Sequence, residues 1–351
     1  MNKTACVITT INSPNSGMNQ LFEYARDTNN DLIVVADKKT PEKWINHCTE
    51  FLSVPNQEAS DFTISRLLPW NHYARKNLGY LVSMQKKTEW IYETDDDNIP
   101  LSNPFNFGHF NKFIDSVMNE TGKWVNIYTE FNPINLPNEE KLTIWPRGLP
   151  LEEIYKKNQK IEIEAPHLLL WQGLANGDPD VDAIFRLIHP DKTEIKFEPN
   201  KNIVLNNKNW SPFNSQTTWW NKALFPLMYL PATCTFRVTD ILRSYITLRI
   251  LRELKTSIGF TSPVVYQNRN EHNLIKDFES ETQLYILGNK YIDRLESLKF
   301  VENQTIGEML FKCYEVAESI GLTSKKEYDI LSGWLSDLKQ LGYISAMSRK
   351  L

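Results

Sequence analysis

The stretch that decides the fold is Trp90-Ile91-Tyr92-Glu93-Thr94-Asp95-Asp96-Asp97-Asn98-Ile99-Pro100. Its apolar and aromatic first half is typical of a buried strand, and the final proline cannot continue a strand's hydrogen bonding. Three consecutive carboxylates therefore stand where the strand ends, which is where open α/β sheets bind ligands. We expect this triplet to hold a hard divalent cation. The alternative is an acidic turn, in which Asp95 or Asp97 caps the next element and Asp96 is solvated.

The residues before this stretch alternate between strand and helix patterns. Residues 5–10 and 31–36 are apolar runs typical of strands, and residues 19–26 between them have a helical pattern. Residues 70–87 carry apolar side chains at roughly helical spacing and lead directly into the acidic strand. Repeated strand-helix-strand units predict a parallel sheet flanked by helices, so we expect an α/β fold.

The rest of the chain is less regular until its C-terminal part. Residues 103–230 are rich in proline and tryptophan, which predicts walls and loops more than regular layers. A helical stripe returns at residues 239–254. Capping signals then mark two further helices: Thr305 with Glu308, Ser324 with Glu327, and the glycines Gly321 and Gly342. We predict a catalytic domain at residues 1–265 and a helical accessory region at residues 266–351.

Composition narrows the class of protein. The 351 residues are 41% hydrophobic and 23% charged, which is typical of a globular protein with a full core. A formal net charge of -4 gives little attraction to phosphate backbones, so we expect no nucleic-acid partner. The cysteines form no CxxC pair and predict free thiols, not a zinc site or a disulfide framework: Cys6, Cys48, Cys234 and Cys313.

The N-terminus does not resemble a targeting segment. The apolar run at residues 5–8 is too short for a signal-peptide core, and no apolar run approaches the roughly 20 residues needed to span a bilayer. We therefore expect a cytoplasmic protein. Peripheral association with a membrane, through a partner or a lipid-linked substrate, stays compatible with this expectation, as does a homo-oligomer.

The acidic triplet indicates the kind of ligand. Mg²⁺ and Mn²⁺ prefer oxygen ligands and usually complete their coordination with water and substrate phosphates, so a substrate that carries a diphosphate, such as a nucleotide-sugar, fits. The metal would stabilise charge on the departing nucleoside diphosphate. If strand alternation continues to the end, Asp95 and Asp97 share one face and Asp96 the other. We predict Asp97 first, then Asp95, as the metal ligands.

Other polar residues stand at neighbouring strand ends. Thr10, with Asp37 and Lys38, follows the two predicted parallel strands, on the same rim as the triplet, where an Asp can accept a hydrogen bond from a ribose or base. Arg75 and Asn77 begin the helix before the acidic strand and could contact a phosphate or a base edge. We expect these residues and Asp95 to bind the nucleotide in one crevice. Taken singly, each has an ordinary alternative, such as a turn aspartate or a surface ion pair.

Several separated motifs resemble one family in the same order. They are Arg75-Lys76-Asn77-Leu78-Gly79-Tyr80, Tyr92-Glu93-Thr94-Asp95-Asp96-Asp97-Asn98, Ile144-Trp145-Pro146-Arg147-Gly148-Leu149-Pro150-Leu151, Gln172-Gly173-Leu174-Ala175-Asn176-Gly177-Asp178-Pro179-Asp180-Val181-Asp182-Ala183 and Phe236-Arg237-Val238-Thr239-Asp240-Ile241. These motifs look like the STELLO-type glycosyltransferases and, more distantly, the reversibly glycosylated polypeptides, which include UDP-arabinopyranose mutases. They span roughly residues 5–255, and the tail after residue 266 is outside the resemblance.

The resemblance implies a GT-A fold, related to the Rossmann fold, with a nucleotide-sugar donor, UDP-linked in the relatives, and a Mn²⁺ or Mg²⁺ ion at the triplet. It also implies a special role for Arg147, because the Arg-Gly-x-Pro pattern of the reversibly glycosylated polypeptides carries the arginine that becomes glycosylated. Two plainer alternatives are a cation facing the diphosphate and a loop arginine paired with Glu152 or Glu153.

Two carboxylates are candidates for acid-base chemistry. Asp180 lies in the loop at residues 177–182 and could orient a sugar hydroxyl or act as a base, while Asp182 in the same loop has the ordinary role of a helix cap. Asp240 is the leading base, because it stands between Arg237 and Arg243 and matches the family motif, although the first turn of a helix favours a carboxylate in any case.

The aromatic and histidine residues give weaker signals. Five tryptophans could stack on sugars or fill the core: Trp145, Trp171, Trp210, Trp219 and Trp220. Four histidines show no metal-ligand spacing: His72, His109, His167 and His189.

The sequence therefore predicts a metal-dependent glycosyltransferase that acts on an unknown glycan, lipid-linked or protein acceptor. A nucleotide-sugar mutase would use the same donor site but interconvert the ring form of the sugar. A noncatalytic scaffold or regulator of glycan synthesis, with the helical tail as its docking surface, is the alternative from another class.

Overall fold

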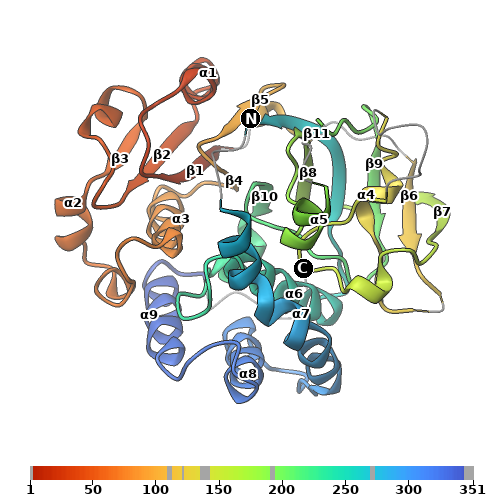
Figure 1. Ribbon diagram of the computed structural model, residues 1–351. Helices are drawn as coiled ribbons and strands as arrows, with labels where there is room; N and C mark the ends of the chain where they lie inside the picture. Colours follow the sequence, from red (N-terminus) through yellow and green to blue (C-terminus); the bar gives the residue numbers. More distant parts are fainter. Residues whose placement is uncertain are drawn as a thin grey trace.

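A large mixed sheet forms the centre of the molecule (Figure 1). The computed structural model describes residues 3–108, 113–120, 122–134, 143–189, 194–268 and 273–343. Its strands are β1 (Thr4–Thr10), β2 (Asp31–Ala36), β3 (Glu50–Leu52), β4 (Trp90–Thr94), β5 (Asn98–Pro100), β6 (Phe113–Met118), β7 (Gln159–Glu164), β8 (Leu170–Gly177), β9 (Asn202–Leu205), β10 (Thr217–Asn221) and β11 (Gly259–Gln267). They are ordered β3-β2-β1-β4-β10-β8-β11-β9-β6-β7, and β5 pairs with β11.

The first four strands of this order form the predicted parallel half. β2 pairs with β1 and β3, and β1 pairs with β4, all in parallel. After β4 the sheet becomes mixed, because β10 runs antiparallel to both β4 and β8. The predicted α/β class is confirmed, and the architecture agrees with a Rossmann-like fold of the GT-A type.

The irregular middle of the chain contributes more sheet than we expected. Strands β6 to β10 all come from it, although prolines and long connections separate them. β8 illustrates why periodicity does not reveal every one of them: almost all of its residues are buried, so apolar and polar residues do not alternate. The section therefore supplies strands of the central sheet as well as the expected walls and loops.

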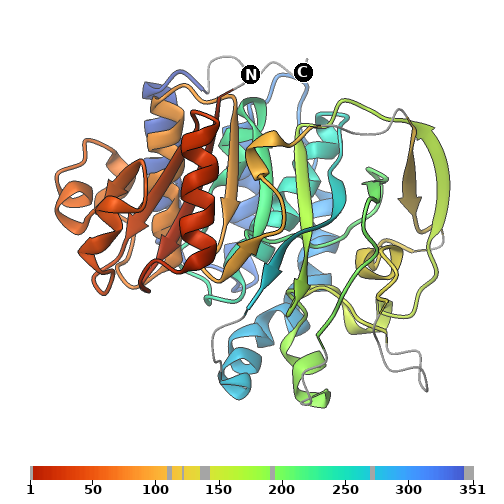
Figure 2. The same cartoon turned by 90° about the horizontal axis from the view of Figure 1, so that it is seen from above.

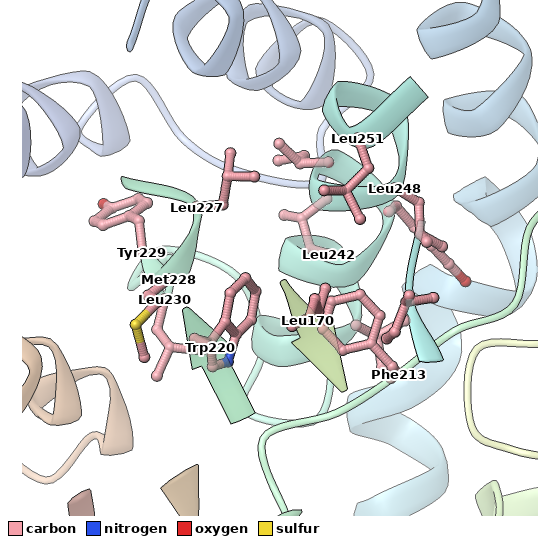
Figure 3. Packing of buried hydrophobic residues seen from close by; sticks show 14 of the residues in the cluster. Leu170, Phe213, Trp220, Leu227, Met228, Tyr229, Leu230, Leu242, Leu248 and Leu251 are labelled. Atoms are coloured by element: carbon pink, nitrogen blue, oxygen red, sulfur yellow. The ribbon is translucent and has the colours of Figure 1, made fainter. Parts of the chain in front are cut away.

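Helices cover both faces of the sheet (Figures 1 and 2). The α-helices are α1 (Ser16–Asp27), α2 (Val54–Glu58), α3 (Lys76–Gln85), α4 (Ile127–Glu130), α5 (Ala183–Ile188), α6 (Thr239–Glu253), α7 (Leu274–Ser297), α8 (Ile306–Ser319) and α9 (Glu327–Gln340). On one face, α1 packs Met18 and Leu21 into a cluster with Ile8 and Val34. On the other, α3, α6 and the C-terminal helices share a larger cluster, part of which Figure 3 shows. No helix in the described part of the chain is both long and apolar enough to cross a membrane.

The C-terminal helices begin and end largely as the sequence predicts. Thr305 and Glu308 form a capping box at the start of α8, and Gly321 follows that helix with a φ of +84°. The predicted pairing of Ser324 with Glu327 does not form. α9 begins at Glu327, whose carboxylate instead accepts hydrogen bonds from the backbone nitrogens of Ala232 and Thr233.

Two other buried acids tie these helices to loops of the α/β part. Asp337 of α9 accepts hydrogen bonds from the backbone nitrogens of Thr63 and Ile64, at 2.8 and 2.9 Å. Glu281 of α7 accepts one from the backbone nitrogen of Ala183 at 2.8 Å. These acids and Glu327 are fully buried, so each helix supplies acceptors that the loops would otherwise lack. The division into two domains at residue 265 stays a prediction.

One buried ion pair joins the acidic strand to helix α6. Glu93 of β4 accepts hydrogen bonds from Arg243 of α6, with Nη2 at 2.7 Å and Nη1 at 3.0 Å. Trp220 Nε1 donates to the same carboxylate at 2.8 Å, and the Tyr80 hydroxyl is a further donor. Both charged side chains are almost completely inaccessible. This pair sets the position of β4, and with it the acidic triplet, relative to α6.

We expect Arg243→Met to lower the free energy of unfolding by about 3–5 kcal/mol, because it leaves the Glu93 carboxylate buried without its counter-charge. Urea denaturation measures the loss. Lys222→Met is the matched control: the Lys222–Glu89 pair is 2.8 Å long, but its side chains are 52% and 36% exposed. It should cost less than about 1 kcal/mol. Equal losses in the two variants would contradict this assignment.

Candidate functional site

A cavity of about 470 Å³ opens at the carboxyl ends of β1, β2 and β4. Most of the residues that we predicted from sequence line it: Thr10, Asp37, Arg75, Asp95, Asp97, Arg147, Asp180 and Asp240, together with Asp96. The structure therefore brings together strand ends and loops that lie up to 230 residues apart in the chain. Two predicted residues, Lys38 and Asn77, do not line it.

The acidic triplet occupies the turn between β4 and β5, and its three side chains diverge. The Lys76 Nζ contacts Asp95 Oδ1 at 3.2 Å, and the Asp97 Oδ2 accepts a hydrogen bond from Gln267 Nε2 at 3.1 Å. The Asp96 Oδ2 accepts one from Asn12 Nδ2 at 3.0 Å, and the Thr10 hydroxyl donates to the same oxygen. The expected strand alternation is therefore wrong beyond Thr94, because the backbone has already turned.

Asp95 combines a polar contact with an unusual environment. Its side chain is 42% exposed and lies on the wall of the cavity. Burial raises the pKa of Asp95 to about 7, against the positive charge of Lys76, and the negative charge of Asp97 adds to the rise. Lys76 is completely buried and also donates to the Thr94 carbonyl at 2.8 Å. Asp95 therefore changes its charge near neutral pH.

Asn77 and Lys38 have other surroundings than we expected. Asn77 is fully buried in α3, and its amide makes two hydrogen bonds with the backbone of Leu230, at 2.8 and 2.9 Å. Lys38 is exposed, and its Nζ lies 5.6 Å from the centre of the Trp70 ring. In place of Lys38, the next residue, Lys39, lines the cavity.

Asp37 accepts hydrogen bonds from nearby backbone nitrogens and also lines the cavity. Its Oδ1 accepts from the backbone nitrogen of Lys38 at 2.7 Å, and its Oδ2 accepts from that of His72 at 3.1 Å. These contacts are those of a turn aspartate, which was the ordinary alternative. A carboxylate has about four acceptor sites, so Asp37 can still accept a hydrogen bond from a molecule in the cavity that it lines.

In the wall of the same cavity, Arg147 is held between two carboxylates. Its Nε and Nη2 contact Asp180 at 3.0 and 2.7 Å. Its Nη1 and Nη2 contact Asp240 at 2.9 and 3.0 Å, and Nη1 also donates to the Arg237 carbonyl. These acceptors match all five N–H groups of the guanidinium. Arg147 therefore fixes the orientation of Asp180 and Asp240, and it does not pair with Glu152 or Glu153.

The Arg147 guanidinium also sets the charge state of Asp240. Burial raises the pKa of this carboxyl, but the adjacent positive charge outweighs burial and holds the pKa below its ordinary value. The Asp240 Oδ2 also accepts from the backbone nitrogen of Ser215 at 3.2 Å. Asp240 is thus a well-anchored anion.

Helix α7 supports this part of the cavity wall. Glu281 of α7 accepts a hydrogen bond from Arg237 Nε at 2.8 Å, and Arg237 Nη2 forms ion-pair contacts at 2.6 Å with Glu281 and 3.6 Å with Asp180. Asp182 caps α5, as its ordinary alternative predicted, by accepting from the backbone nitrogen of Phe185 at 2.7 Å. Burial raises the pKa of Asp182 to about 6.

Several cavity residues had no role in the sequence prediction. They are His72, Tyr73, Asn214, Ser215, Gln216, Phe236 and Gln267. Phe236 is 55% exposed, and its ring centre lies 4.5 Å from that of Tyr73. Its place as the first residue of the motif Phe236-Arg237-Val238-Thr239-Asp240-Ile241 was the available signal for it. By contrast, the five tryptophans that could have stacked on a sugar are all buried, and His109 lies outside the described residues.

The acidic triplet offers two carboxylates to a hard cation, but not a complete set of protein ligands. In the described part of the chain, no three His, Cys, Asp or Glu side chains are arranged to hold a metal ion. Asp95 and Asp97 nevertheless present carboxylates to one cavity, and their charges interact. Two carboxylates are what Mg²⁺ typically takes from a protein when substrate phosphates and water supply the other ligands. The donor set therefore fits a cation that binds together with a diphosphate.

Comparisons with known proteins support the resemblance that the motifs indicated. A family model described as STELLO glycosyltransferases matches residues 237–348. The expectation that the C-terminal tail lies outside the resemblance is therefore wrong, because the match covers α7, α8 and α9.

Two curated relatives from Arabidopsis thaliana extend the similarity. They are named "Probable glycosyltransferase STELLO2" and "Probable glycosyltransferase STELLO1", and each is 25% identical, over 327 and 335 residues respectively. Each alignment covers 89% of this chain, which spans only 42% and 41% of the relatives. The predicted resemblance is confirmed: the chain is similar to the STELLO glycosyltransferases along most of its length.

Proposed function

We propose that the chain is a metal-dependent glycosyltransferase that transfers a sugar from a nucleoside-diphosphate sugar to an acceptor. The observation that carries the proposal is the single cavity that gathers the acidic turn, Asp37, Arg75 and the Arg147 cluster. The names of the similar proteins support the reaction class. The nucleotide-sugar donor, the acceptor and the metal are proposed here in addition to that reaction class.

The charge of the cavity supports a cation. Six aspartates line it, against four lysines and arginines. A diphosphate would add negative charge to this surplus of carboxylates, and a divalent ion held by Asp95 and Asp97 would offset both. When bound, the ion would act as a Lewis acid that stabilises the leaving diphosphate.

The residues of the chain divide the remaining tasks. Thr10, Asp37 and Arg75 lie along the ends of β1 and β2 and suit the nucleoside. Asp180 and Asp240 line the same cavity, and Arg147 fixes their carboxylates beside the space that the sugar would occupy. The predicted base role of Asp240 is not part of this proposal, because a carboxylate held by an arginine has a low affinity for protons. Glycosylation of Arg147 is left out as well, because its N–H groups are all engaged.

A thermal-shift screen of nucleoside diphosphates and nucleotide-sugars, with and without Mn²⁺, tests the donor site. We expect UDP and UDP-sugars to stabilise the protein mainly when Mn²⁺ is present. At a ligand concentration 100 times the Kd, the stabilisation is about 2.7 kcal/mol. Asp97→Ala should abolish it, and Asp61→Ala, which changes an exposed aspartate outside the cavity, should not. Equal stabilisation of the Asp97→Ala variant would remove the metal site from the proposal.

Radiolabelled nucleotide-sugars then distinguish the reaction. A transferase passes label to an acceptor and otherwise shows only slow hydrolysis of the donor. An isomer of the donor, formed with no acceptor present, would identify a mutase instead. Tight binding without turnover on every donor would identify a noncatalytic regulator.

We also expect the ligand-induced stabilisation to depend on pH through Asp95. Its folded-state pKa of about 7 lies above the ordinary value of 3.8. In the metal-free protein, ionisation of Asp95 therefore lowers the free energy of unfolding progressively as the pH rises from about 4 to 7. The reason is that the folded state keeps this proton to a higher pH than the unfolded state does. A cation needs the ionised carboxylate, so stabilisation by Mn²⁺ with UDP should be larger at pH 8 than at pH 6.

Asp95→Asn is the control for this pH dependence. Metal-free Asp95→Asn should lose less stability than the wild type between about pH 4 and 7, as measured by urea denaturation. It should also lack the part of the Mn²⁺ effect that wild type gains between pH 6 and 8. Identical pH profiles of the two proteins would contradict the shifted titration of Asp95.

A further inference from the structure

Arg75 lines the cavity and is held there by two hydrogen bonds, while one nitrogen of its guanidinium has no partner in the described part of the chain. Its Nε donates to Gln57 Oε1 at 2.6 Å and its Nη1 to the Leu68 carbonyl at 3.1 Å. The guanidinium carbon lies 3.5 Å from the centre of the Trp70 ring. Arg75 is only 1% exposed, yet its Nη2 has no hydrogen-bond partner among the described residues. A buried donor without an acceptor is costly unless a ligand supplies one.

His72 provides a second donor of this kind. The backbone nitrogen of Ala74 donates to His72 Nδ1 at 3.0 Å, so Nδ1 is the acceptor and the proton of the neutral ring is on Nε2. His72 Nε2 is buried and has no hydrogen-bond partner in the described part of the chain. Burial lowers the pKa of His72, against the negative charge of Asp37, which keeps the ring neutral. Like Arg75, His72 lines the cavity.

The neighbouring Asp37 indicates which ligand group these donors face. Its carboxylate accepts from the His72 backbone, and its negative charge acts on both His72 and Arg75. A phosphate placed here would be repelled by this carboxylate. A neutral group with acceptor oxygens is not repelled, and an N–H beside those oxygens could donate to Asp37.

We propose that His72 and Arg75 recognise the nucleobase of the donor, and that they select a uracil-type base. Such a base presents two carbonyl oxygens on either side of one N–H, which matches two donors beside a carboxylate acceptor. Cytosine replaces one of these oxygens with an amino group, which leaves one donor facing a donor. The inference rests on the proposed nucleotide-sugar site and assigns its base specificity to two side chains.

Isothermal titration calorimetry with saturating Mn²⁺ tests this assignment, using UDP, CDP, GDP, ADP and inorganic pyrophosphate. The variant is His72→Asn. Asparagine is a preferred helix-capping residue and can still accept from the Ala74 nitrogen, but it lacks the Nε2 donor. Arg75→Lys keeps the positive charge and removes Nη2. His47→Asn is the control, because His47 is only half-buried and lies outside the cavity.

We expect the wild type to bind UDP roughly tenfold more tightly than CDP or the purine nucleotides. His72→Asn and Arg75→Lys should each remove most of this preference and leave the affinity for pyrophosphate unchanged, while His47→Asn should behave like the wild type. Because the two variants test the same base independently, loss of folding in one leaves the other decisive.

Three results would overturn the assignment while the proposed function stands: equal binding of UDP and CDP by the wild type, an unchanged preference in both variants, or an equal loss of pyrophosphate and UDP affinity. The last result would place the two side chains against phosphate. If the folded wild type binds none of the nucleotides, the proposed function itself fails, and the base assignment with it.

Discussion

The buried ion pair between Glu93 and Arg243 is the constraint on which the geometry of the site depends. Glu93 lies two residues before Asp95 on β4, and Arg243 lies three residues after Asp240 on α6. One contact between strand and helix therefore sets the separation of the two acidic groups of the cavity. Two charges can be buried here because hydrogen bonds from Tyr80 and Trp220 also reach the carboxylate. The sheet and the helical layer are thus joined within three residues of Asp95 and Asp240.

On this frame the two groups of aspartates are held in different ways. Arg147 is completely hydrogen-bonded, and it holds Asp180 and Asp240 in single orientations. In the acidic turn, Asp95, Asp96 and Asp97 each contact a different element. In the proposed function, a metal and a diphosphate would complete a ligand set of which the protein supplies only the carboxylates.

The sequence predicts the parallel half of the sheet well, because apolar runs end abruptly in polar residues at β1, β2 and β4. It also predicts that Asp37, Arg75 and Asp95 share a crevice, since carboxyl ends of parallel strands meet at one edge. It cannot predict the Arg147 cluster, whose partners lie 33 and 93 residues further along the chain. Asn77 misled us for a similar reason: its backbone partner, Leu230, is 153 residues away. Strand β8 has no alternation that marks it, because it is buried almost throughout, whereas the alternation at residues 160–164 of β7 was an available signal.

The position of Glu281 links the cavity and the start of α5 to a helix that does not line the cavity. One carboxylate on α7 contacts both Arg237, which lines the cavity, and the backbone at the start of α5. A change of charge at position 281 would therefore disturb both places at once, and a neutral residue there would leave the Arg237 guanidinium facing Asp180 alone. A substitution in the C-terminal helices can in this way alter the site without contacting a ligand.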